Sequence, residues 1–350
     1  MIEQKEIAVG HYPFKIDDDL TKIRQAFGTQ YRMLVGILPL EQKEKDQALD
    51  TLFNHYLKVE GLGLKERQLR LSGEPKTNLT YHDINHFWQC GFDGATIARY
   101  LYTTRRFIGD NITPEGVIAT ALAAWLHDIG EITASPVLDL GIPKEMHYTQ
   151  QPYPTLAEHK PIHVQAGMHF AEQICKQFAF ENPLDNEWIA TLVQHGMHNT
   201  LFPLKEEHQR ERQQMLRFLS PKRRREAWLV RLAVQAADLF GQSVRQDQIP
   251  VGLIRLRTEE NEIEAGQGTK LLGTDEQLLP KTRWFAEHIL VPTVGINVNA
   301  LLGRENVFIA EVAKLLERPD LIDKEVSFTK ILRTIPEHKK TPATILRTAA

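Results

Sequence analysis

The sequence predicts an all-α protein. Long stretches repeat apolar residues at intervals of three and four, as in "ALDTLFNHYLKV" over 48–59, which is the period of an amphipathic helix. The stretch "EGVIATALAAWLHDIG" over 115–130 is apolar nearly all round and predicts a buried central helix. A short strand-like run appears after Pro250, so we expect the C-terminal part to be mixed but mostly helical.

The expected elements follow from this spacing and from the turn residues between them. The segment "GLGLKERQLRLSGEPKTNLT", 61–80, is turn-rich and predicts a loop or linker. At 113–116, "TPEG" offers a cap followed by proline in the first helical turn. Several prolines predict a loop over 133–157. Helices are expected over 17–36, 41–60, from Thr80 or Tyr81 onward, from Pro114 to Gly130, and over 159–179, 185–198, 205–219, 222–245, 276–290 and 306–317.

The change of character after Pro250 suggests a boundary near that residue. We therefore expect a helical N-terminal segment over 1–70, a central domain over 71–250 and a C-terminal extension over 251–350. The sequence shows no internal repeat and no low-complexity segment.

Composition narrows the class of protein. The 350 residues are 42% hydrophobic and carry a formal net charge of -3, so the chain has no global basic signature for nucleic acid. Cys90 and Cys175 are far apart and lack CxxC spacing, which is typical of reduced thiols on helices. The first residues lack the apolar core of a signal peptide, and no apolar run reaches the length of a membrane helix. We expect a cytoplasmic, soluble protein.

The motif "AAWLHDIGE" places His127 and Asp128 at the end of the apolar helix. A buried carboxylate beside a buried imidazole is costly unless another group compensates it. A divalent metal ion would interact favourably with both side chains. The alternative is a hydrogen-bonded His–Asp pair that caps the helix.

The segment "YHDINHFWQC" raises a similar choice for His82 and His86. Their spacing of four would place both imidazoles on one helical face. Three interpretations are open. Both histidines are metal ligands, one is a ligand and the other a proton donor, or neither has a role in the chemistry. Three further helices present a polar ligand type from an apolar face, at His163, His195 and Asp238. Because the cost of desolvation recurs in each helix, a shared ion is the simplest explanation.

The order His … His-Asp … His … His … Asp resembles the HD superfamily of metal-dependent phosphohydrolases, over about residues 80–245. "HDIG", "HVQAG" and "AADLFGQS" are similar to its motifs. The resemblance implies an HD-type helical bundle with two divalent ions, of iron, manganese, zinc, cobalt or nickel. A hydroxide shared by the two ions would attack phosphorus. The first ion would be held by His86, His127, Asp128 and Asp238, and the second by Asp128, His163 and His195.

The run "YHDINH" is similar to a motif of the cyclic-nucleotide phosphodiesterase branch of that family. By this likeness His86 is the ligand and His82 is the general acid, with catalysis resting on His82 and Asp128. Asp83 stands where that branch has asparagine, so the branch stays open. The chain looks unlike the HD-GYP branch, because Glu131 replaces the lysine after "HDIG" and no Gly-Tyr-Pro follows "HGMHNT".

Several nearby residues allow more than one interpretation. Glu131 would form a salt bridge, shuttle protons or, as we favour, face solvent. His198 is a candidate third-ion ligand or phosphate donor, and Lys160 near a helix start is a candidate phosphate contact. The basic side chains at 222–225 would bind phosphates or nucleic acid. The alternative is that they are solvated at the start of a helix.

We expect a metal-dependent phosphoric ester hydrolase that acts on a nucleotide or related small phosphate. The alternatives are an HD-type di-iron oxygenase, which uses the same ligands, and a non-catalytic HD scaffold or regulatory binding module. Nucleic acid is a weakly supported partner, and we expect no membrane partner.

Overall fold

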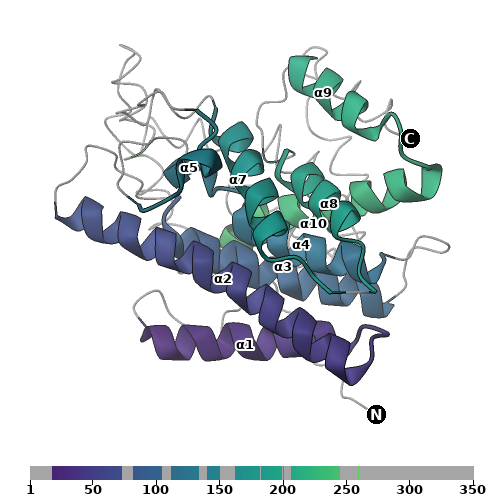
Figure 1. The fold of residues 1–350 in the computed structure, drawn as a ribbon, viewed down its shortest axis with the longest axis horizontal. Coiled ribbons are helices and arrows are strands. Elements are labelled where there is room, and N and C mark those ends of the chain that lie inside the picture. The colour runs from purple at the N-terminus through teal and green to yellow at the C-terminus, as the bar shows by residue number, and fades with distance from the viewer. Residues whose placement is uncertain are drawn as a thin grey trace, which may run out of the picture. The chain divides into compact units, whose positions relative to one another are not determined.

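A computed structural model describes residues 18–72, 82–104, 112–133, 140–149, 162–181, 183–198, 200, 206–244 and 259. Every regular element in these ranges is helical, which confirms the predicted all-α class (Figure 1). The elements are α1 (Leu20–Gly36), α2 (Gln42–Leu71), α3 (Ile84–Thr104), α4 (Pro114–Leu126), α5 (Gly130–Thr133), the 3₁₀ turn η1 (Lys144–Met146), α7 (His163–Gln177), α8 (Asn186–His198), α9 (Glu206–Leu216) and α10 (Pro221–Val244). The helices predicted over 276–290 and 306–317 lie outside the described residues.

The helix α4 is the centre of the bundle. All of its residues from Gly116 to Leu126 are buried, as its uniform apolar sequence predicted. The helix α3 packs along α4, and α8 and α10 contact α4 as well (Figure 1). The predicted cap is present, because the Thr113 hydroxyl accepts a hydrogen bond from the Gly116 amide and Pro114 begins the helix.

Two glycines allow the helices around α4 to approach closely. A Cβ atom at Gly94 of α3 would lie 2.2 Å from the Cβ of Ala124, and one at Gly196 of α8 would lie 2.8 Å from the Cβ of Ala123. Only a residue without a side chain fits at these crossings. The short distances bring α3, α4 and α8 together at the end of α4 where the candidate site lies.

The helix α2 is longer than predicted. It runs through Gly61 and Gly63 to Leu71, where the sequence predicted a loop. Glycine inside a helix costs about 1 kcal/mol relative to alanine, so these residues favoured a turn. Packing explains Gly63, because a Cβ there would lie 2.6 Å from the Cδ1 of Ile84 at the start of α3.

Two other boundaries differ from the prediction in ways that affect the site. The helix α3 begins at Ile84, so His82 and Asp83 precede it instead of lying within it. The helix α4 ends at Leu126, and a turn at 127–129 separates it from the short α5. His82 therefore does not share a helical face with His86, and the premise that both project from one helix is wrong.

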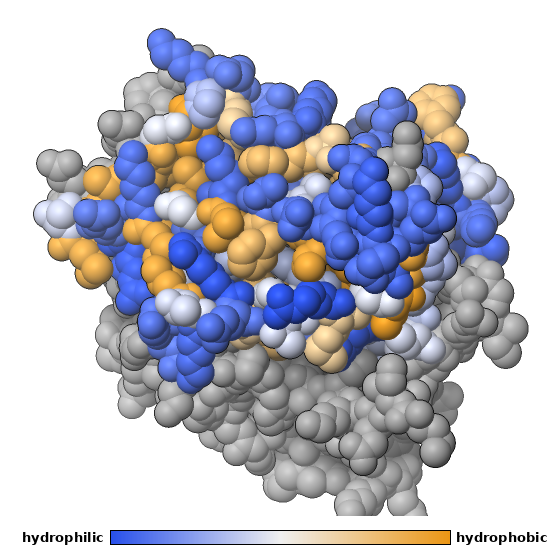
Figure 2. All heavy atoms as spheres, turned by 60° about the horizontal axis from the view of Figure 1, so that its bottom comes forward, coloured by the Kyte–Doolittle hydropathy of each residue, from blue (hydrophilic) through white to orange (hydrophobic). Residues whose placement is uncertain are grey.

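Hydrophilic and hydrophobic residues are interspersed on the surface that Figure 2 shows. On the face in Figure 2, hydrophobic residues form small areas between hydrophilic ones. Among the helices of the described ranges, none combines the length and the apolar character that are needed to cross a bilayer. These helices all belong to one compact unit that covers residues 1–278.

Candidate metal centre

Two buried imidazoles meet at the end of α4. His86 lies in the first turn of α3, and His127 follows the last residue of α4. Their Nε2 atoms are 3.1 Å apart, and both residues are at most 2% exposed. The Nδ1 of His127 lies 2.9 Å from the Ala124 carbonyl oxygen, so we assign the Nδ1–H as donor to that oxygen. This assignment directs the Nε2 of His127 toward His86, as is typical of a metal-ligating histidine.

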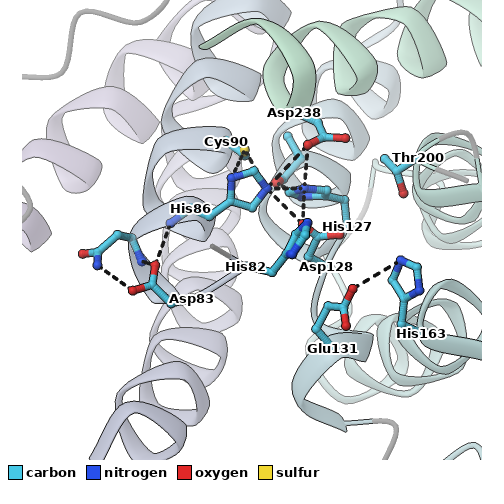
Figure 3. A network of polar contacts seen from close by, with 12 residues as sticks. His82, Asp83, His86, Cys90, His127, Asp128, Glu131, His163, Thr200 and Asp238 are labelled. Carbon is cyan, nitrogen blue, oxygen red and sulfur yellow. Dashed lines mark hydrogen bonds and ion pairs between the residues drawn. The ribbon is translucent and has the colours of Figure 1, made fainter. Parts of the chain in front are cut away.

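Two carboxylates complete this cluster (Figure 3). The Oδ2 of Asp128 lies 2.9 Å from the Nε2 of both His86 and His127. The Oδ1 of Asp238, which projects from α10, lies 3.5 Å and 3.4 Å from the same two nitrogens. The structure thus brings together the four residues predicted to hold the first ion, from α3, α10 and the turn after α4.

The charges in the cluster are strongly interdependent. Burial by itself lowers the pKa of His127, but the charges of Asp128 and Asp238 outweigh burial and raise that pKa well above its ordinary value. Burial likewise favours protonated carboxylates. The neighbouring His127 nevertheless holds the pKa of Asp128 well below its usual range and lowers that of Asp238 to about 2. The raised imidazole pKa values favour bound protons beside the two carboxylates in the absence of metal, and a divalent cation would supply positive charge in place of such protons.

A thiol also belongs to this cluster. Cys90 lies one turn after His86 on α3, is 1% exposed, and places its Sγ 3.6 Å from both ring nitrogens of His86. One ligand atom from each of His86, Cys90, His127 and Asp238 lies within 4.8 Å of the others. The sequence interpretation treated Cys90 only as a reduced thiol on a helix. Its spacing of four from His86 was the signal that could have placed it at the site.

A second group of ligand types adjoins the first. Ligand atoms of His82, Asp128 and Glu131 lie within 4.8 Å of one another. The Oε1 of Glu131 is also 3.5 Å from the Nε2 of His163. Asp128 therefore lies in contact with the first cluster and also belongs to the second group.

The preferred prediction that Glu131 faces solvent is wrong, because this residue is 1% exposed. The cause lies in the preceding glycine. A Cβ at Gly130 would lie 1.6 Å from the carbonyl oxygen of His163, so α5 packs directly against the start of α7. This contact directs Glu131 into the bundle, toward His163.

His82 is held by a residue that the sequence did not indicate. The Nδ1 of His82 lies 2.7 Å from the Oε1 of Glu259, and the backbone amide of His82 donates to the Oε2 at 2.8 Å. Glu259 is 1% exposed and comes from the predicted C-terminal extension. The Nε2 of His82 lies 3.9 Å from the Oδ2 of Asp128, so the Nε2 side of the ring is directed toward the centre. No motif surrounds Glu259, so only the fold reveals it.

Asp83, the residue that left the family branch open, caps α3. Its Oδ1 accepts from the amides of Asn85 and His86 at 2.9 Å and 3.4 Å, and its Oδ2 accepts from the Asn85 side chain at 2.8 Å. These bonds fix the first turn of the helix that carries His86.

The remaining candidates are placed as follows. His195 is buried on α8, but among the described residues it belongs to neither group of converging ligand atoms. His198 is buried on α8 and lies 3.1 Å from the Oε2 of Glu211 on α9. Lys160 lies outside the described residues.

The comparisons with known proteins add no assignment: no protein family, no curated protein and no solved structure matches this chain.

Proposed function

We propose that this chain is a metal-dependent phosphohydrolase of the HD superfamily type, which hydrolyses a phosphoester in a nucleotide or a related small phosphate. One observation carries the proposal: His86, His127, Asp128 and Asp238 were inferred to be ligands from motif order alone, and their side chains converge. These residues are separated by up to 152 positions in the sequence, from 86 to 238. Four such groups are costly to bury without compensation, and a shared cation would compensate the carboxylates and use the imidazoles as ligands.

The cluster has dimensions that suit a metal ion. With metal–nitrogen distances of about 2.0–2.1 Å, neighbouring ligand atoms lie roughly 3.3–3.4 Å apart around a tetrahedral ion and roughly 2.9 Å apart around an octahedral one. The nitrogen and oxygen atoms of the cluster are separated by 2.9, 3.1, 3.4 and 3.5 Å. Imidazole and carboxylate ligands suit zinc, manganese, iron, cobalt or nickel better than calcium.

A bound divalent ion would supply Lewis-acid polarisation of a phosphoryl oxygen and a water of lowered pKa. The chain supplies the rest. Asp128 would connect the two ligand groups, and Glu131 and His163 offer further donors on the second side. His82 would donate a proton to the leaving oxygen from its Nε2, while Glu259 holds the opposite nitrogen.

The support around His82 favours hydrolysis over the oxygenase alternative. Hydrolysis needs a proton donor beside the ions, whereas oxidation of a C–H or C–P bond does not. Glu259 holds His82 through two contacts, with the ring Nδ1 at 2.7 Å and with the backbone amide at 2.8 Å. A ring that merely filled space would not need a buried carboxylate partner, since burial of that carboxylate is costly.

The experiment begins with elemental analysis of the purified full chain. A screen of mononucleotides, cyclic nucleotides and short oligonucleotides with manganese or zinc follows. We expect metal-dependent release of phosphate or of a cleaved ester. The His82→Ala variant should keep its metal and lose about 10²–10⁴-fold in turnover.

A matched control is His169→Gln, since His169 lies on α7 and its Nε2 contacts the Glu145 carbonyl oxygen at 3.0 Å, away from both ligand groups. This variant should retain full turnover. Loss of one metal equivalent in His82→Ala would make His82 a ligand instead of a proton donor. Oxygen consumption by an iron-containing protein, without hydrolysis of any phosphoester, would favour the oxygenase.

A further inference from the structure

We propose that the thiolate of Cys90 is a direct ligand of the metal ion at His86, His127 and Asp238. A sulfur that joins the imidazole and carboxylate donors of this centre favours zinc or another thiophilic ion. The inference rests on the proposed metal centre, but it does not depend on which reaction the centre catalyses. Neither the HD resemblance nor the motif order includes a cysteine at this position.

The first argument is geometric. With a metal–sulfur distance of about 2.3 Å and a metal–nitrogen distance of about 2.0–2.1 Å, sulfur and nitrogen ligands of a tetrahedral ion lie roughly 3.5–3.6 Å apart. The Sγ of Cys90 lies 3.6 Å from the Nε2 of His86. The separation of Sγ and Nε2 therefore matches that of a sulfur and a nitrogen ligand of one ion. The spacing of four residues on α3 produces this arrangement, because such side chains are neighbours on a helix.

The second argument is the convergence of the thiol on more than one ligand residue. Besides its 3.6 Å contacts with both ring nitrogens of His86, the Sγ of Cys90 lies within 4.8 Å of ligand atoms of His127 and Asp238. Because Sγ is equally far from Nδ1 and Nε2, ligation requires the His86 ring or the Cys90 side chain to turn until Nε2 and Sγ face the same ion.

The third argument is chemical. Cys90 is 1% exposed, so water does not compete for its sulfur. Thiolate ligands favour zinc and iron(II) over manganese and magnesium, whereas imidazole and carboxylate alone discriminate less. The adjoining group of His82, Asp128 and Glu131 contains no sulfur. The two sides of the centre therefore differ in ligand softness, and the side of Cys90 should retain zinc.

The test uses cobalt(II) as the probe, with the full chain kept reduced. Cobalt bound to a thiolate shows a sulfur-to-metal charge-transfer absorption in the near ultraviolet, which nitrogen and oxygen ligands do not give. We expect this band in the metal-reconstituted wild type and in Cys175→Ser, and its loss in Cys90→Ser. Cys175 is the matched control, because it is the other buried free cysteine and lies on α7.

Zinc titration provides the second readout. Removal of a group that only supports a ligand lowers metal affinity about 10–100-fold, so loss of a ligand should cost at least that much. We expect Cys90→Ser to lower the affinity for zinc more than the affinity for manganese. Cys175→Ser should change neither affinity. Circular dichroism of Cys90→Ser and of a second variant, Cys90→Ala, checks that the helices persist without the thiol.

Bound cobalt without the charge-transfer band in the wild type would overturn the assignment, as would an unchanged band in Cys90→Ser. The proposed hydrolase fails by a different result. If no phosphoester is cleaved but the band depends on Cys90, the ligand assignment stands and the function does not.

Discussion

The imidazole of His82 is fixed by the carboxylate of Glu259, a residue 177 positions later in the chain. Glu259 accepts at 2.7 Å from the ring Nδ1 and at 2.8 Å from the backbone amide of the same residue. Two contacts from one buried carboxylate fix both the ring orientation and the chain segment that carries it. Glu259 is thus a positioning residue for the proposed proton donor.

Glu259→Gln should lower kcat about 10–100-fold, while KM and metal content stay unchanged. The neutral amide has one acceptor oxygen where the carboxylate has two, so it cannot accept from both the ring and the backbone amide of His82. Steady-state kinetics, with metal analysis of each sample, separates the loss in kcat from any change in KM or metal content.

Glu211→Gln is the matched control for this variant, because the Oε2 of Glu211 lies 3.1 Å from the Nε2 of His198 outside both ligand groups. Glu211→Gln should leave kcat, KM and metal content unchanged. A Glu259→Gln protein with a normal rate, or one that has lost metal, would contradict the positioning role.

The parts that sequence predicted well are those where local pattern and burial agree. The apolar stretch before His127 predicted α4, and each helix that carries an inferred ligand is present in the structure. The positions that it mispredicted depend on tertiary contacts. Gly63 suggested a turn, but it allows α2 to pass Ile84. Contacts of this kind lie between elements and leave no local periodic signal.

The site shows the same division. His127 and Asp128 were predictable because a buried ion pair at a helix end is chemically conspicuous. Glu131 was not, because its burial depends on the contact between Gly130 and α7. Glu259 was not predictable either, since it reaches His82 only through the path of the chain after α10.

Asp128→Ala should abolish metal binding and activity together. The Oδ2 of Asp128 lies 2.9 Å from both imidazoles, and the residue also belongs to the group with His82 and Glu131. Its loss removes a donor from both sides of the centre. It also leaves two buried histidines with one carboxylate fewer, and breaking a buried ion pair costs about 3–5 kcal/mol. Metal analysis and a chemical denaturation curve test both expectations. A variant that still binds two equivalents of metal would exclude the bridging role.

The metal-free protein should lose stability as pH rises above neutrality. The raised pKa values of His86 and His127 mean that their contribution is fully present below the ordinary value of about 6.5, and is lost as pH rises through the folded-state values. Asp238, with its pKa lowered to about 2, contributes above the ordinary value of about 3.9 and loses that contribution as pH falls. His55, whose pKa burial lowers to about 4, affects only the acidic side of this range.

Thermal melts at pH 5.5 and pH 9 (about three units apart, spanning the ordinary histidine value) measure this effect, with chelator in one series and zinc in the other. In chelator the Tm should be lower at the higher pH. Zinc should remove most of that difference, because the ion replaces the lost protons. An equal or higher Tm at pH 9 in chelator would mean that the two imidazoles are neutral in the metal-free cluster.

Gly130→Ala should destabilise the fold and weaken metal binding on the side of Glu131. The added Cβ would lie 1.6 Å from the His163 carbonyl oxygen and 2.7 Å from the Gly167 amide nitrogen, which are backbone atoms that cannot rotate away. The helices α5 and α7 must separate, and overpacking of this kind costs about 1–3 kcal/mol. The separation moves His163 away from Glu131. The metal ion on the side of Glu131 should therefore bind more weakly, while the affinity of the ion at His86 and His127 changes less. Denaturation midpoints and zinc stoichiometry report the two effects.

Gly36→Ala is the control, since nothing lies within 4 Å of its added Cβ. Equal stability of the two variants would show that the contact between α5 and α7 does not hold Glu131 in place.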